Sequence, residues 1–269
     1  MNRKLGIVAD CLKDVKPADA LDLIADTGFE TVFTGVVDEC GLGEIKNKCD
    51  KLGLELEFVH APFKGINNMW LEGDEYLTVY NGMKESIYSC HSCDVKSTVC
   101  HISSGWLAPQ INDLGLSRFD ELVDLAVKQN VTIAFENLRK AGNVTYFTDR
   151  YDGVEQVRFC YDCGHEHCYT EHVPFVDIFA DRLICTHLHD NFGRSKTDRM
   201  ADGDLHLLPF DGNVDYRKMI DKLDEYDYRG SLMLEVFDGM SRKYLDWGRE
   251  KFVKEAFERV SKINSFSRK

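Results

Sequence analysis

Eight short runs of β-branched or apolar residues recur along the 269-residue chain, and each is separated from the next by enough sequence for a helix. They cover residues 5–9, 31–34, 54–59, 97–100, 131–135, 157–161, 183–186 and 231–236. Strands that alternate with helices favour a parallel sheet, because parallel neighbours need a crossover connection. Eight such repeats are typical of a (β/α)₈ TIM barrel, and we predict this α/β fold as a single domain over residues 1–269.

The connections between these runs contain helix-like patterns. Residues 17–27 have apolar side chains at helical spacing and are followed by Gly28, a common helix stop. A second helix is expected at 117–129 with Ser117 as its N-cap. Two further helices are expected at 215–226 and 249–263. The alternative is an open doubly wound sheet, which usually has a Gly-rich turn after its first strand if it binds a nucleotide. The chain has no such turn there.

The net charge of the chain limits the classes of partner that we expect it to bind. It has 46 acidic and 33 basic side chains, a formal net charge of −13, so it lacks the basic surface expected of a nucleic-acid binder. The apolar run at 5–9 is too short for a signal peptide, and no stretch reaches the roughly 18 apolar residues of a membrane span. We therefore expect a cytoplasmic protein that does not interact with membranes. Whether it forms a homo-oligomer stays open.

Ten cysteines in such a chain indicate free thiols rather than a disulfide framework. Two CxxC pairs occur, Cys90/Cys93 and Cys160/Cys163. A structural zinc shared between these pairs is the lesser alternative, because a free cysteine commonly packs as a small hydrophobic residue.

Ionisable residues follow six consecutive expected strands, from the third to the eighth, and always at the same end. They are His60, His101, Glu136, Asp162, His165, His187, His189, Asp190 and Glu235. The carboxyl ends of barrel strands form a ring around one cleft, where the active sites of such barrels lie. Charged groups that point into this cleft need partners, and a divalent cation is a strong one. The pattern predicts a metal-dependent enzyme.

Four motifs at these positions, and a fifth at residues 204–206, resemble those of the xylose-isomerase-like barrel superfamily, over nearly the whole chain. They are His60-Ala61-Pro62, Glu136-Asn137, Asp162-Cys163-Gly164-His165, His187-Leu188-His189-Asp190 and Asp204-Leu205-His206. That superfamily includes sugar and sugar phosphate isomerases and epimerases, inositol-pathway dehydratases and apurinic-site nucleases of the endonuclease IV type.

The resemblance implies a metal site of four ligands, which are Glu136, Asp162, His187 and Glu235. His187 is preferred to His189 because the family's ligand stands three residues before an acidic residue, here Asp190. His189 is then expected behind the metal or beside the substrate. Three carboxylates and one histidine suit Mn²⁺, Mg²⁺ or Co²⁺, and Zn²⁺ is also tolerated.

The resemblance also implies further metal or substrate contacts. His165 matches a residue that lies near the substrate in the epimerases and binds another zinc in the nucleases. The histidines His60 and His101 match zinc ligands of the nucleases, and Asp204 and His206 match the remaining pair.

The expected activity is isomerisation or epimerisation of a sugar, sugar phosphate or polyol. A divalent ion stabilises the enediolate while Glu136 and Glu235, from different strands, remove and return a proton. His165 and Arg194 are candidates for holding substrate hydroxyls. The alternatives are a zinc phosphodiester hydrolase of the endonuclease IV type, a metal-dependent dehydratase, and a non-catalytic sugar-binding protein.

Overall fold

The structure is a computed structural model that describes residues 2–171 and 173–268. Its eight parallel strands are hydrogen-bonded in the order β7-β6-β5-β4-β3-β2-β1-β8. Their bounds are β1 Leu5–Val8, β2 Thr31–Thr34, β3 Glu55–His60, β4 Ser97–Cys100, β5 Thr132–Glu136, β6 Val157–Asp162, β7 Leu183–His187 and β8 Leu232–Leu234. A parallel bridge between Leu188 and Leu234 brings the two ends of this sheet together. The predicted (β/α)₈ barrel is therefore confirmed.

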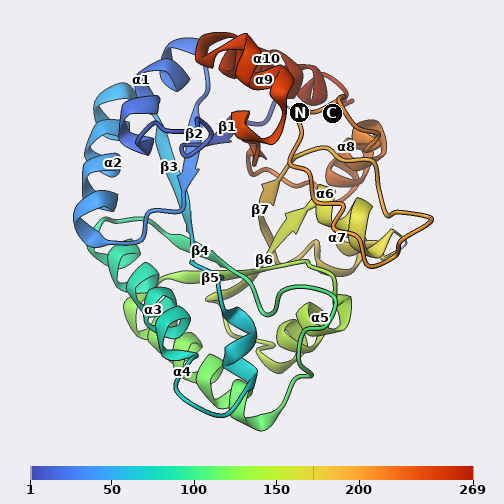
Figure 1. The fold of residues 1–269 in the computed structure, drawn as a ribbon. Helices are drawn as coiled ribbons and strands as arrows, with labels where there is room; N and C mark the ends of the chain where they lie inside the picture. Colours follow the sequence, from blue (N-terminus) through green and yellow to red (C-terminus); the bar gives the residue numbers. More distant parts are fainter. Residues whose placement is uncertain (1, 172, 269) are drawn as a thin grey trace.

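Helices surround the strands on the outside of the barrel (Figure 1). They are α1 Pro17–Thr27, α2 Glu39–Leu52, α3 Leu77–Ser92, α4 Asp113–Gln129, α5 Ala141–Arg150, α6 Cys163–His165, α7 Phe175–Phe179, α8 Tyr216–Glu225, α9 Arg242–Trp247 and α10 Arg249–Asn264. Three shorter helical segments complete the connections: η1 Ile66–Trp70, η2 Glu166–Thr170, which is a π-helical turn, and η3 Asp238–Met240.

The ends of two helices test the sequence predictions. Gly28 follows α1 with φ of 111°, a left-handed conformation that glycine adopts without strain. The start predicted for α4 was wrong. This helix begins four residues earlier, at Asp113, where the Asn112 side chain accepts a hydrogen bond from the Gly115 N–H at 2.9 Å. Ser117 lies inside the helix and donates to the Leu114 carbonyl. An equally good capping residue upstream therefore starts the helix.

Side chains fill the barrel below its mouth. Phe33 and Phe58 stack at 4.7 Å, and Phe33 also stacks on His187 at 4.9 Å. The pairing of β2 with β3 skips Glu57, which accepts hydrogen bonds from the hydroxyls of Thr31 and Ser231. Because the interior is packed, a substrate can bind only at the mouth of the barrel, where the polar residues at the strand ends lie.

All ten cysteines are free thiols, as expected, and eight of them are buried. Among the described residues, no cysteine belongs to a group whose atoms lie close enough together to hold a metal ion. The alternative of a zinc shared by the CxxC pairs thus has no support. No helix in the described ranges is long and apolar enough to cross a membrane.

Candidate metal centre

Four side chains from four neighbouring strands converge at the barrel mouth. Glu136 ends β5, Asp162 ends β6, His187 ends β7 and Glu235 follows β8. His187 Nδ1 lies 3.4 Å from Glu136 Oε1, 3.4 Å from Glu235 Oε2 and 3.9 Å from Asp162 Oδ2. The four ligand atoms all lie within 4.8 Å of one another. The structure thus brings together the four residues predicted as the main metal ligands, and we call them the quartet.

The donor atoms of the quartet fit a cation. Glu136 Oε1, Asp162 Oδ2 and His187 Nδ1 are buried, and none makes a well-aligned hydrogen bond within the described part of the chain, although His165 Nδ1 lies 3.0 Å from Glu136 Oε1. Buried polar atoms rarely remain without partners, because an unsatisfied group costs about 1–3 kcal/mol. A divalent ion with hard oxygen and imidazole ligands would satisfy all three atoms at once.

Glu136 also faces a second group, formed with His60 and His101. Its Oε2 atom lies 3.0 Å from His101 Nε2 and 3.3 Å from His60 Nε2. All three residues are buried. One carboxylate oxygen of Glu136 therefore points to the quartet and the other to these two histidines.

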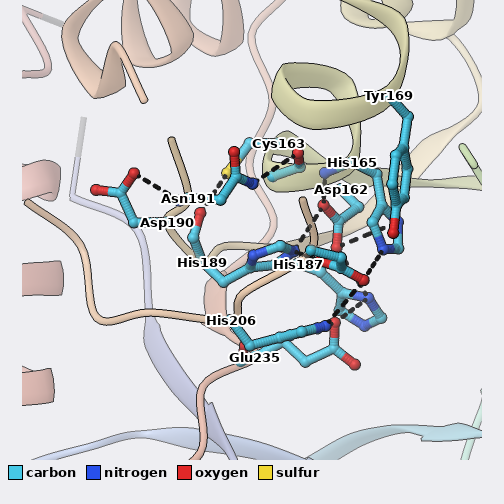
Figure 2. A network of polar contacts seen from close by, with 12 residues as sticks. Asp162, Cys163, His165, Tyr169, His187, His189, Asp190, Asn191, His206 and Glu235 are labelled. Carbon is cyan, nitrogen blue, oxygen red and sulfur yellow. Dashed lines mark hydrogen bonds and ion pairs between the residues drawn. The ribbon is translucent and has the colours of Figure 1, made fainter. Parts of the chain in front are cut away.

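A third group lies on the other side of Asp162. It consists of His165, His189, Asp204 and His206. Asp204 Oδ2 is 3.1 Å from His165 Nε2 and 3.3 Å from His206 Nε2. His189 Nε2 lies 3.1 Å from Asp162 Oδ1, so this histidine borders the quartet. Figure 2 shows His165, His187, His189 and His206 gathered around Asp162 and Glu235.

The protonation states follow from these contacts. Burial alone would raise the pKa of Glu136, but its contacts with His187 and His101 hold it well below its ordinary value. Burial would lower the pKa of His187, yet Glu235 and Glu136 raise it to about 10. Without a metal, a protonated His187 thus acts as a counter-ion for these carboxylates. Burial lowers the pKa of His101, so this histidine does not share that role. A divalent ion would take over that role and release protons.

Amide side chains hold the strand ends that carry the quartet. The Asn137 side chain accepts from the Asp162 N–H and donates to the Asp162 carbonyl, both at 2.8 Å. The Asn191 side chain donates to the Gly164 carbonyl at 2.9 Å. These bonds extend the pairing of β5 with β6 and of β6 with the end of β7. They therefore hold the backbone of the candidate ligand residues in place.

Space for His189 depends on a glycine in α6. A Cβ atom at Gly164 would lie 2.0 Å from Cε1 of the His189 ring, far inside contact distance. The Asp162-Cys163-Gly164-His165 motif thus supplies two candidate ligands and room for a third residue. This packing role was not evident from the sequence.

A cavity of about 170 Å³ opens over these groups. It is lined by His60, Phe63, His101, Ser104, Leu138, Arg139, His165, Asp202, Asp204, His206 and Glu235. A larger cavity of about 420 Å³ lies between η2, α7 and α8 and is lined by none of the residues of the three groups. We place the candidate site in the smaller one, since the buried ionisable groups converge there.

One predicted residue lies apart from the three groups. Arg194 was expected to hold substrate hydroxyls, but its guanidinium lies 4.4 Å from the centre of the Trp106 ring. It belongs to none of the three groups, and it is absent from the cavity lining. Arg139, which does line the cavity, was missed, although it stands only three residues after Glu136.

Parts of this sequence are similar to parts of known proteins. The protein y4fM of Sinorhizobium fredii is 36% identical over 125 residues, which cover 44% of this chain and 37% of that protein. An inosose dehydratase of Glaesserella parasuis is 26% identical over 135 residues, 44% of this chain and 45% of the other. The matches thus span less than half the length of these two relatives.

Solved structures resemble the whole fold. A D-psicose 3-epimerase from Clostridium cellulolyticum H10, solved with D-tagatose, superimposes with a TM-score of 0.77 over 98% of this chain and 99% of its own, at 14% identity. At that identity the likeness shows the fold alone. A family model described as a xylose isomerase-like TIM barrel matches residues 21–262, and the chain therefore belongs to that family.

Proposed function

We propose that this protein is a divalent-metal-dependent isomerase or epimerase that acts on a sugar or a related polyol. The observation that carries the proposal is the quartet, in which Glu136 and Glu235 each place an oxygen 3.4 Å from the same nitrogen of His187. The two carboxylates come from strands that are not neighbours, β5 and the end of β8. The similarity to a D-psicose 3-epimerase in fold and an inosose dehydratase in sequence supports a small hydroxylated substrate.

The quartet supports proton transfer at carbon. A divalent ion, when bound, would polarise a substrate carbonyl and so acidify the neighbouring C–H bond. Glu136 and Glu235 reach the same point from different sides, so one can remove the proton and the other can return it. His165 and His206 border the cavity and are placed to hold substrate hydroxyls. The apolar ring of Phe63 covers His101 at 4.3 Å and helps to exclude water.

Substitution of the two glutamates tests this role. We expect Glu136→Gln and Glu235→Gln each to abolish exchange of a ketose C–H proton with D₂O, measured by NMR on D-psicose and D-tagatose. A dehydrated product formed by the parent protein in the same spectra would indicate a dehydratase, whereas an epimerase forms only the epimeric ketose. A thermal midpoint measured beside each assay shows whether the variant is folded. A folded variant that keeps the parent's exchange rate removes that glutamate from the mechanism.

A second candidate function is hydrolysis of a phosphodiester by a cluster of zinc ions. It is favoured by the two groups beside the quartet, since His60, His101 and Glu136 could hold one more ion and the Asp204 group another. Metal analysis of the purified protein decides between the candidates. One ion per chain supports the isomerase, whereas three zinc ions per chain support the hydrolase.

A further inference from the structure

Two arginines and two aromatic rings form one wall beside the candidate site. We call this the arginine wall, and it consists of Arg139, Tyr169, Trp106 and Arg194. Arg139 lines the site cavity, and its side chain is only 11% exposed. Its Cζ atom lies 3.8 Å from the centre of the Tyr169 ring, and Tyr169 stacks on His165 at 5.2 Å. Figure 2 shows Tyr169 lying flat against His165. The guanidinium is thus held at a fixed place relative to a residue of the site.

The hydrogen bonds of Arg139 leave donors for a ligand. Its Nη2 atom donates to Asp202 Oδ1 at 2.7 Å, and the same oxygen accepts from the Tyr169 hydroxyl. The Asp202 side chain is 68% exposed, so water screens this ion pair. The Nε atom of Arg139 is buried and has no hydrogen-bond partner within residues 2–171 and 173–268. A guanidinium presents five N–H donors, and an anion with two or more oxygens could accept from those that remain.

A second positive charge stands beside the first. Arg139 and Arg194 approach the same Trp106 ring, with their Cζ atoms 5.7 and 4.4 Å from its centre. The Nε atom of Arg194 is also buried and without a hydrogen-bond partner in the described ranges. Two guanidiniums near one ring repel each other, and among the described residues Asp202 forms an ion pair with Arg139 alone of the two. The cavity lining itself also contains the carboxylates of Asp202, Asp204 and Glu235, so the attraction for an anion depends on the direct contact with Arg139.

We propose that the arginine wall binds an anionic group of the substrate, a phosphate or a carboxylate, at the end remote from the reacting carbonyl. Arg139 makes the direct contact, and Arg194 strengthens the positive field. This inference rests on the proposed function, because it assigns the substrate of that site to the sugar phosphates or sugar acids. Stacking on aromatic rings fixes both guanidiniums before the substrate arrives, so little side-chain freedom is lost on binding.

Three probes of one carbon skeleton test the proposal. Isothermal titration of the metal-loaded protein measures the affinity for D-fructose, D-fructose 6-phosphate and D-fructuronate. We expect one of the two anionic probes to bind at least about tenfold more tightly than D-fructose, since hydrogen bonds to a charged group contribute about that factor or more. A preference for the 6-phosphate identifies a sugar phosphate, and a preference for D-fructuronate identifies a sugar acid.

Arg139→Met should weaken binding of the preferred anionic probe by about 10- to 100-fold and binding of D-fructose much less, so that the anion preference is lost. Arg139→Lys keeps the charge without the planar fork, so its affinity should fall between those of the parent and Arg139→Met. The matched control is Arg150→Met. Arg150 also pairs with an aspartate, Asp120, at 2.6 and 3.0 Å, but it lies on α5 and is absent from the cavity lining. This variant should bind all three probes like the parent.

The inference is overturned if the parent binds D-fructose as tightly as both anionic probes, or if the anion preference persists in a folded Arg139→Met protein. Its failure is distinct from a failure of the proposed function, because binding requires no turnover. If the anion preference depends on Arg139 while no ketose exchanges a proton with D₂O, the arginine wall stands and the isomerase proposal falls. If a ketose exchanges its proton but the protein shows no anion preference, the isomerase proposal is supported and the inference on the arginine wall is contradicted.

Discussion

At the scale of single residues, Glu136 is the most heavily shared group of the site. Four histidines lie within 3.4 Å of its carboxylate: His60, His101, His165 and His187. Its side chain is fully buried, so its charge depends on these neighbours or on a bound ion. Any change at this position therefore alters several candidate ligand groups together.

His187, at the end of β7, and His189, two residues later, have different expected effects on metal binding. His187 Nδ1 contacts three carboxylates of the quartet, whereas His189 Nε2 contacts only Asp162 among them. We expect His187→Ala to lose the quartet's ion. His189→Ala should retain it and lose about 10- to 100-fold in turnover, the usual effect of removing a supporting partner of a ligand. Metal analysis after dialysis measures both.

The opposite result would be a metal-free His189→Ala protein and a fully loaded His187→Ala protein. It would show that the metal ligand of β7 lies two residues later than predicted. Loss of one ion out of several from His189→Ala would instead assign His189 to the Asp204 group as a ligand.

Residues on strands were easier to predict than residues on loops. Strand ends fix which side chains meet at the mouth, and eight of the ten residues in the three groups lie at or just after a strand end. The other two, Asp204 and His206, lie on the loop between β7 and α8 and were identified only through the family resemblance. Arg139 and Tyr169 lie beyond the ends of β5 and β6, where no periodicity determines the path of the chain. Tyr169 belongs to a π-helical turn, a rare geometry with no recognised sequence signal. Arg194 also lies on a loop, so its contact with Trp106 could not be predicted from the sequence.

At the scale of elements, the irregular pairing of β3 leaves the half-buried carboxyl group of Glu57 in contact with Thr31 of β2 and with Ser231, the residue before β8. Glu57 falls where the register shifts, since Val32 pairs with Leu56 and Phe33 with Phe58. The sequence predicted this strand but could not predict the shift, because the shift depends on contacts with β2 and with Ser231 near β8.

Glu57 should make stability depend on pH. Burial raises its pKa, although the hydroxyls of Ser231 and Thr31 partly oppose this. A raised folded-state pKa means that the folded protein binds the proton more tightly than the unfolded chain does. The stabilisation is complete below the unfolded pKa of about 4.3 and is lost as pH rises through the folded pKa. Glu57→Gln should therefore gain stability over the parent as pH rises.

Urea unfolding of parent and variant at pH 4 and pH 8 measures this difference. The variant should be the more stable protein at pH 8, and its advantage should shrink at pH 4. Glu55→Gln, at an exposed position of the same strand, is the control and should show no such trend. An equal effect of Glu57→Gln at both pH values would contradict the prediction.

The short helix α6 has no room for a side chain at Gly164. Gly164→Ala would place a methyl group against the His189 ring, and overpacking of this kind costs about 1–3 kcal/mol. We expect a lower free energy of unfolding and weaker metal binding. Gly43→Ala is the matched control in α2, where the nearest atom lies 3.9 Å from the added Cβ, and it should stabilise by up to about 1 kcal/mol. Equal stability of the two variants would show that His189 moves aside freely.

At the scale of the whole molecule, the candidate metal groups are compatible with phosphodiester hydrolysis, whereas the net charge opposes binding of a nucleic acid. The ten clustered residues include every type needed to hold several zinc ions around a phosphodiester. The chain nevertheless carries a formal charge of −13, and a protein that binds duplex DNA must neutralise phosphates with lysine and arginine. The site thus permits phosphate chemistry, whereas the charge opposes a polyanionic substrate. A small anion held by Arg139 is compatible with both.

We therefore expect no useful affinity for duplex DNA that contains an abasic site, even when the protein is loaded with zinc. A gel-shift and nicking assay at roughly 0.15 M salt tests this, because exposed charges are then screened beyond about 8 Å. Lower salt should not rescue binding, since weaker screening increases the repulsion between an acidic protein and the phosphates. A small phosphodiester, bis(p-nitrophenyl) phosphate, serves as the parallel substrate. Its hydrolysis without DNA cleavage would support the zinc hydrolase on small substrates, whereas specific nicking of the abasic duplex would contradict the prediction.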